Sequence, residues 1–136
     1  MIQIIAGKKG SGKTKRLIDL TNTTAKESNS DVIFLDDDTR YMFDVDHKVR
    51  FINASEYHVH TAEMFLGFLS GMLSCNFDIG TIFIDSFLKI GKMEMEGCEG
   101  FLNSLNELCA KHNVNFVLSL SADPDELPEF MKGYLI

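Results

Sequence analysis

The sequence predicts an α/β fold with three layers around a mostly parallel sheet of five strands. Short apolar runs rich in β-branched residues recur along the chain, and stretches with helical periodicity separate them. Strands that alternate with helices connect by right-handed crossovers, which makes the strands parallel and places helices against the sheet. The 136 residues are about the length of one ordinary domain, so we expect a single domain over residues 1–136.

Four apolar runs supply strands of this sheet. They are MIQIIA at residues 1–6, DVIFLD at 31–36, TIFID at 81–85 and VNFVLSLS at 114–121. Continuous apolar runs of this kind are typical of strands covered on both faces. We expect KVRFIN at 48–53 to be an extra edge strand or an extended cover, and YLI at 134–136 to be a short terminal strand.

Three stretches carry the periodicity of helices that bury one face. Their apolar stripes are Leu17, Ile18, Thr21, Thr24 and Ala25 in 13–28, Met64, Phe65, Phe68, Leu69 and Met72 in 61–75, and Phe101, Leu102, Leu105, Leu108 and Cys109 in 99–112. A fourth helix is expected in 122–133, with Asp123 as its N-cap and Gly133 as its stop. Residues 88–100 have no clear period, and we expect a mobile or lid-like segment there, the alternative being a plain surface loop.

The composition argues against several classes of protein. The net charge of −7 opposes the sequence-indifferent binding of nucleic acid, which requires a broad basic surface. The chain has no apolar run of about 20 residues, so we expect no insertion into a membrane. Cys75, Cys98 and Cys109 are odd in number and lack CxxC spacing, which favours reduced thiols and a cytoplasmic location.

A glycine-rich loop between the first strand and the first helix predicts a phosphate site. Its pattern is GxxxxGK[ST], and its residues are Gly7, Lys8, Lys9, Gly10, Ser11, Gly12, Lys13 and Thr14. Glycines let consecutive backbone N–H groups from about Gly10 to Thr14 point at one anion, and the first turn of the helix adds to the attraction. Lys13 supplies a charge between the outer two phosphates, and the Thr14 hydroxyl is a hard oxygen ligand for Mg²⁺.

An acid at the end of another strand is expected to complete this site. Asp85, at the end of TIFID, fits a ligand that holds Mg²⁺ through a water molecule. Asp36, at the end of DVIFLD, competes for the role, and the order of the strands favours Asp85. We therefore assign Lys13 and Asp85 as catalytic residues, and Thr14 and Asp85 as metal ligands.

These motifs give the chain a specific family resemblance. GKKGSGKT resembles a Walker A motif and TIFID a Walker B motif, so residues 1–122 resemble the P-loop NTPases. The resemblance implies a three-layer fold, bound ATP with Mg²⁺, and the strand order 5-1-4-3-2 of the branch in which a strand separates the two motifs. It also implies a γ-phosphate sensor at Ser119 or Ser121, of which we assign Ser121. The chain is similar to small uncharacterised ATP-binding proteins of bacteria, some of them named after pilus-retraction ATPases.

One departure from the family pattern bears on turnover. The family usually has a Glu after the Walker B Asp to activate water, and this chain has Ser86. Asp36, Asp37 or Asp38 could substitute if the second and third predicted strands are neighbours. Arg40 and Arg50 are candidates for a charge-neutralising finger, including one supplied across a dimer.

The sequence therefore favours a Mg-ATP-binding protein that acts as a slow ATPase, a nucleoside-triphosphate hydrolase, or as a nucleotide-dependent switch. Such a switch would act through a protein partner or a homo-oligomer. A module that binds ATP without turnover is one alternative. The other is a small nucleoside or nucleotide kinase, because DDDTRYMFDVDH at 36–47 resembles the D-x-R-Y segment of tetrameric thymidine kinases. A guanine-reading NKxD motif is absent around LSLSAD, which lowers GTP relative to ATP.

Overall fold

A computed structural model describes residues 1–136, and its elements alternate as the sequence predicts. The strands are β1 (Ile2–Gly7), β2 (Asp31–Asp36), β3 (Arg50–Asn53), β4 (Ile79–Ile84) and β5 (Asn115–Ser121). The helices are α1 (Lys13–Glu27), α2 (Ala62–Cys75), α3 (Phe87–Gly91), α4 (Glu99–His112) and α5 (Glu129–Lys132). Short 3₁₀ turns lie at Ala54–Glu56, Met95–Gly97 and Pro124–Glu126.

The five strands form one parallel sheet in the order β1-β5-β4-β2-β3. This order confirms the predicted succession of the four apolar runs, with β5 between β1 and β4. The extra edge strand within 48–53 is also confirmed as β3. The predicted terminal strand is reduced to a single parallel bridge between Ile4 and Leu135. Within β1, only Ile4 forms backbone hydrogen bonds with residues 134–136: its N–H donates to the Tyr134 carbonyl, and its carbonyl accepts the Ile136 N–H.

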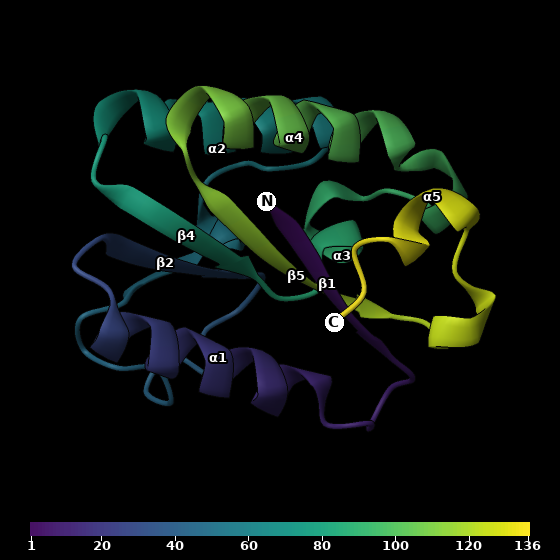
Figure 1. Cartoon of the computed structure of the whole chain (residues 1–136), viewed down its shortest axis with the longest axis horizontal. Helices are drawn as coiled ribbons and strands as arrows, with labels where there is room; N and C mark the ends of the chain where they lie inside the picture. The colour runs from purple at the N-terminus through teal and green to yellow at the C-terminus, as the bar shows by residue number, and fades with distance from the viewer.

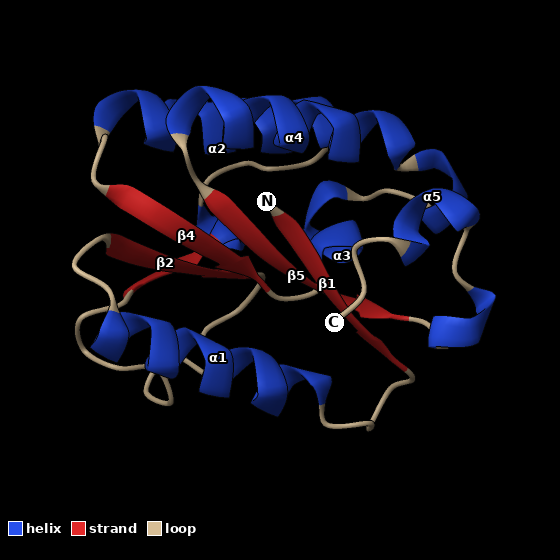
Figure 2. Ribbon diagram, in the orientation of Figure 1, coloured by secondary structure: helices blue, strands red, loops and turns tan.

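Helices cover both faces of the sheet. α1 lies on one side, and α2 and α4 lie on the other (Figures 1 and 2). Alternate residues of each strand therefore enter two separate cores. The smaller core, under α1, contains Ile5, Val32, Phe34, Phe83 and Val117.

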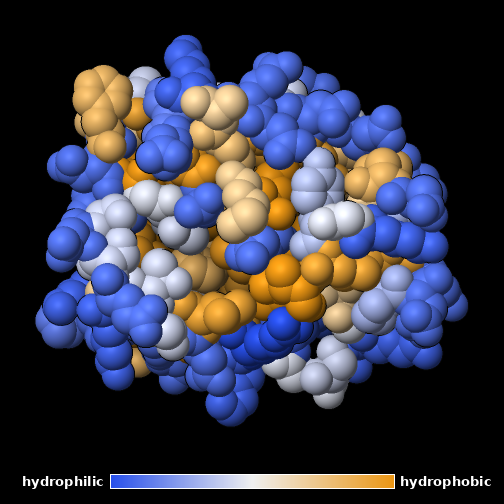
Figure 3. Space-filling view, in the orientation of Figure 1, coloured by the Kyte–Doolittle hydropathy of each residue, from blue (hydrophilic) through white to orange (hydrophobic).

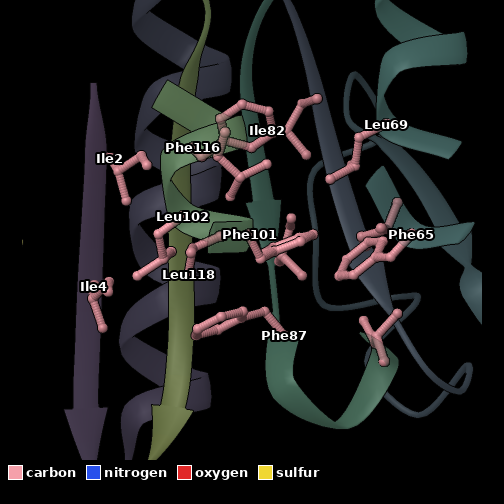
Figure 4. Close-up of a cluster of buried hydrophobic side chains, with 14 of the residues drawn as sticks. Ile2, Ile4, Phe65, Leu69, Ile82, Phe87, Phe101, Leu102, Phe116 and Leu118 are labelled. Atoms are coloured by element: carbon pink, nitrogen blue, oxygen red, sulfur yellow. The ribbon is translucent and has the colours of Figure 1, made fainter. Parts of the chain in front are cut away.

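The larger core lies between the sheet and the helices α2, α3 and α4. Figure 4 shows Phe65, Phe87 and Phe101 converging on the isoleucines and leucines of the strands. The Phe101 ring centroid lies 5.4 Å from that of Phe65 and 6.3 Å from that of Phe87. These stacked aromatic rings lock the three helices to one another as well as to the sheet.

Two helical predictions need correction. In α2, Met64 is 51% exposed, and Leu73 is buried beside Phe65 and Leu69 instead. In the C-terminal segment, the expected single helix is broken into the turn at Pro124–Glu126 and the short helix α5. The cause is Pro128, because a residue before proline is disfavoured in the helical region, and Leu127 is extended with ψ 144°.

Residues 88–100 form neither the lid-like segment nor the plain surface loop that the sequence suggested, because several of their side chains pack against the larger core. α3 forms at the start of this segment, and Ile90, Gly91 and Cys98 are buried in or against the larger core. Met93 and Met95 pack against the same core. The apolar residues lack helical spacing because a short helix, a left-handed residue at Lys92 and a 3₁₀ turn bring them to the core in succession.

The surface mixes apolar and hydrophilic areas. Figure 3 shows apolar residues gathered in the middle of one face, with hydrophilic residues around them. None of the helices has both the length and the apolar character that crossing a bilayer requires.

Candidate functional site

Strand alternation brings polar side chains to one corner of the molecule. Phe34, Phe83 and Val117 point into the core under α1, so the residues two positions later point to the same side. Those residues are Asp36, Asp85 and Ser119, and they stand at the carboxyl ends of β2, β4 and β5. In open parallel sheets this edge is where ligands bind.

The glycine loop (residues 7–14) lies at the same edge, between β1 and α1. Gly10 and Gly12 have φ of 85° and 86°, a left-handed conformation that a side chain would strain. A Cβ on Gly7 would collide with the Ser11 hydroxyl and lie 3.1 Å from the Ser11 Cβ, so the Ser11 side chain would have to shift to admit it.

No side chain caps the start of α1, because its N-cap residue is Gly12. The N–H groups of the first helical turn are therefore left for a ligand, and the helix dipole favours a negative one. This cradle fits a phosphate group.

Asp85 is held in place by a chain of hydrogen bonds. Ser119 donates its hydroxyl to Asp85 Oδ1 at 2.5 Å and accepts the N–H of Ser86 at 2.7 Å. Ser119 is fully buried and Asp85 is 5% exposed. The hydroxyl of Thr14 lies 3.4 Å from both carboxylate oxygens of Asp85. A hydroxyl and a carboxylate that converge in this way are the hard oxygen donors that Mg²⁺ prefers, so the residues present fit the expected metal.

We predict that Ser119→Ala destabilises the protein by about 1–3 kcal/mol, because it removes the closest hydrogen-bond donor of the buried carboxylate and leaves the Ser86 N–H without a partner. Urea denaturation measures the change. Ser121→Ala is the matched control on the same strand, and we expect an effect below about 0.5 kcal/mol because Ser121 is exposed. Equal effects of the two substitutions would show that Ser119 does not hold Asp85 in place.

Asp36 is buried at the edge of the same site. It is 3% exposed, and its Oδ1 accepts the backbone N–H of Asp37 at 2.8 Å. Its Oδ2 is buried and has no hydrogen-bond partner. Burial, reinforced by the charge of Asp85, raises the pKa of Asp36 to about 8.

The next two carboxylates are paired with cations. Lys89 lies 2.9 Å from Asp37, and Arg40 lies 3.6 Å from Asp38. Burial works to raise the pKa of Asp37, but the hydrogen bond and charge of Lys89, together with a hydrogen bond to Asp36, outweigh it and the pKa falls below its usual value. Asp36 is therefore the member of this acidic run without a cationic partner.

Two cavities open on either side of the glycine loop and share Gly12 and Lys13. The larger, of about 970 Å³, reaches from the loop to the ends of β2 and β4 and is lined by Lys9, Gly10, Thr14, Asp36, Asp85 and Ser121 among others. The smaller, of about 400 Å³, is lined by Gly7, Lys8, Ser11, Arg16, Asp123 and Pro124. Every residue that the sequence assigns to the site thus lines one of the two cavities.

Among the residues that the sequence left open, Ser119 and Arg50 line neither cavity, whereas Ser121 and Arg40 line the larger. Asn22 and Lys89 were missed, although both line the larger cavity. Asn22 donates to the Asp44 carbonyl at 3.0 Å and accepts the Asp46 N–H at 2.7 Å, which fastens the loop after β2 to α1. In the sequence, the only sign that Asn22 has such a role was its polar side chain next to the buried stripe of α1.

The arrangement combines an anion cradle, hard oxygen ligands and a buried carboxylate at one cavity. These are components that phosphoryl-transfer sites require for positioning and for charge stabilisation. Comparison with protein-family models finds no match for this chain, and a search of curated proteins finds none either.

Proposed function

We propose that the chain binds Mg-ATP at the glycine loop and hydrolyses it slowly, with the nucleotide state serving as a switch. The observation that carries the proposal is the convergence of the Thr14 hydroxyl and the Asp85 carboxylate at 3.4 Å, beside a loop whose Gly10 and Gly12 are left-handed. The amides of Gly10 to Thr14 would receive the phosphates, and Lys13 would neutralise their charge.

Magnesium, when bound, neutralises the β- and γ-phosphate oxygens and fixes their position. Thr14 would hold it directly and Asp85 through a water molecule. Because the two cavities meet at Gly12 and Lys13, a nucleotide whose terminal phosphate faces Asp85 would extend its nucleoside toward Arg16 and Asp123. The missing guanine motif around residues 119–123 favours ATP over GTP.

The residue after Asp85 supports slow turnover. Ser86 has a left-handed backbone with φ 56°, and its N–H is bound by Ser119. A serine hydroxyl without an activating partner does not accept a proton near neutral pH. Fast hydrolysis would need another group in the place that the family usually fills with Glu.

Ligand-induced stabilisation tests the central claim. We expect millimolar Mg-ATP to raise the thermal midpoint of the wild-type protein by several degrees, because a ligand at 100 times its Kd adds about 2.7 kcal/mol of stability. Lys13→Ala removes the charge that neutralises the phosphates, so it abolishes the rise. Chelation of Mg²⁺ with EDTA should reduce it.

Lys26→Ala is the matched control, because Lys26 is an exposed lysine in the last turn of α1 that lines neither cavity. It should keep the full rise. An unchanged wild-type midpoint, or an equal loss in both variants, would contradict binding at the glycine loop.

A phosphotransferase is the second candidate, favoured by one observation. The loop after β2, including Asp38, Arg40 and Tyr41, lines the same cavity as Thr14 and Asp85, so a second substrate would have room beside the phosphates. Incubation with radiolabelled ATP, alone and with a panel of nucleosides, separates the functions. Label on a nucleoside supports a kinase, free phosphate alone supports an ATPase, and intact ATP supports a binding module. A rate per molecule that rises with protein concentration supports self-association.

A further inference from the structure

We infer that Asp36 accepts the proton of the attacking water, the role that Ser86 does not fill. The inference rests on the proposed ATPase function and assigns a further catalytic residue to it. Three features of the structure support it: the unsatisfied oxygen of Asp36, its place beside Asp85, and the pairing of Asp37 and Asp38 with cations.

The first feature is the free oxygen. Asp36 Oδ2 is the only buried side-chain oxygen or nitrogen in the chain without a hydrogen-bond partner. Buried polar atoms are almost always satisfied in native proteins, and an exception in a cavity wall is expected to meet a ligand or a water. Asp36 is 3% exposed and lines the larger cavity together with Lys13, Thr14 and Asp85. Asp36 therefore stands in the wall of that cavity with one oxygen that no protein group occupies, and a rotation of its carboxyl group would present this oxygen to an O–H group there.

The second feature is the neighbouring strand. β2 pairs with β4 in a register that sets Leu35 beside Ile84, and the Asp85 N–H donates to the Leu35 carbonyl at 2.9 Å. Asp36 and Asp85 therefore leave the sheet side by side, on strands about 4.8 Å apart, and toward the same face. A carboxylate one strand away from the metal-facing acid can reach a water at the terminal phosphate.

The third feature is that the other candidates are engaged. Asp37 is bound to Lys89 at 2.9 Å and Asp38 to Arg40 at 3.6 Å. The hydroxyl of Ser119 is bound to Asp85. Among these polar groups around Asp85, only Asp36 has a buried oxygen that no side chain or backbone group of the protein occupies.

The step balances without any further reactant. The water oxygen forms a bond to the γ-phosphorus, and one water proton moves to Asp36 Oδ2. The bond between the γ-phosphorus and the β–γ bridging oxygen breaks, and its electron pair leaves with ADP. The proton then passes from Asp36 to the released phosphate or to solvent, which restores the carboxylate.

Asp36→Asn tests the assignment, because the amide keeps the shape of the side chain and cannot accept a proton. We expect single-turnover hydrolysis at saturating Mg-ATP and pH 8.5 to fall by about 10²- to 10⁴-fold, the usual contribution of a general base. This pH lies above the pKa of about 8 that burial gives Asp36, so the wild-type side chain is a carboxylate that can accept a proton. The rise in thermal midpoint with Mg-ATP should persist, which shows that the variant folds and binds. Asp31→Asn is the matched control at the other end of β2, where the exposed Asp31 accepts from Asn76 at 2.9 Å, and it should hydrolyse at the wild-type rate.

Asp36→Ala provides a second variant, in which formate can enter the vacated space. We expect added formate to raise the hydrolysis rate of Asp36→Ala by at least about tenfold, a recovery that a purely structural role would not produce. Asp37→Asn should reduce the hydrolysis rate by less than about tenfold, because Asp37 forms an ion pair with Lys89.

The outcomes separate the two levels of the proposal. If Mg-ATP does not raise the wild-type midpoint, or if the wild type releases no phosphate, the proposed function fails. If the rise and the phosphate release are both observed, the inference alone is overturned by either of two results: a wild-type rate in Asp36→Asn, or an equal loss in Asp37→Asn. Each of these would leave the nucleotide site intact and remove Asp36 from the chemistry.

Discussion

Asp36→Asn should stabilise the protein at pH 8.5 by several kcal/mol in the absence of nucleotide and metal, and by only about 1–2 kcal/mol at pH 5, which is little more than one pKa unit above the value of 3.8 for the unfolded chain. The pKa of Asp36 is raised from 3.8 to about 8 because the carboxyl is buried next to Asp85. Between these two values the folded protein holds a proton that the unfolded chain releases. The free energy of unfolding therefore falls as the pH rises through this window, at about 1.4 kcal/mol for each pKa unit.

Urea denaturation in EDTA at pH 5 and pH 8.5 measures this difference between the wild type and Asp36→Asn. At pH 5 the wild-type carboxyl is protonated and resembles the amide, whereas at pH 8.5 it is a buried anion facing Asp85, Asp37 and Asp38. Lys89 and Arg40 do not relieve it, since they are paired with Asp37 and Asp38. A stability difference that stays constant with pH would show that Asp36 ionises freely in the folded protein.

Phe65→Ala is the second large effect, with an expected loss of about 3–5 kcal/mol in the free energy of unfolding. The Phe65 side chain is fully buried under α2, and its ring stacks on Phe101 at 5.4 Å, so its removal opens a cavity between two helices and the sheet. Urea denaturation at neutral pH measures the loss.

Met64→Ala is the control for this prediction, because Met64 precedes Phe65 on the same helix and is 51% exposed. Its effect should stay below about 1 kcal/mol, which is ordinary for a surface position. Similar losses in the two variants would mean that α2 packs on the sheet through a different face.

The difference between Met64 and Phe65 also shows that the sequence alone could not predict which face of α2 is buried. Residues 61–75 are apolar on most sides, so helical periodicity fits more than one stripe. Which stripe is buried depends on where α4 and α3 lie, and their positions follow from contacts far along the chain. The stripe of α1 was predicted more accurately because polar residues surround it: Leu17, Ile18, Thr21 and Ala25 are buried as expected.

The same contrast holds for the candidate site. The glycine loop and Asp85 were predictable because local spacing encodes them, and the order of the strands was predictable from the alternation of elements together with the family resemblance. The role of Ser119 was not. Ser119 and Ser121 project to the same side of β5, and only the register against β4 decides which of them meets Asp85. Lys89 could not be assigned to the site for a related reason, because the sequence around it shows neither helical nor strand periodicity.

The position of β1 in the sheet has a consequence for how the chain folds. Among the five strands β1 pairs with β5 alone, and their register sets Ile2 beside Phe116 and Gly7 beside Ser121. β1 therefore finds its one neighbouring strand far along the chain, after all the other strands. Until β5 fills the space between β1 and β4, the glycine loop has no fixed position relative to Asp85. Pairings between distant segments have to overcome more loop-closure entropy than local ones. We therefore expect β2, β3 and β4 to associate first and the phosphate cradle to be the last part of the site to assemble.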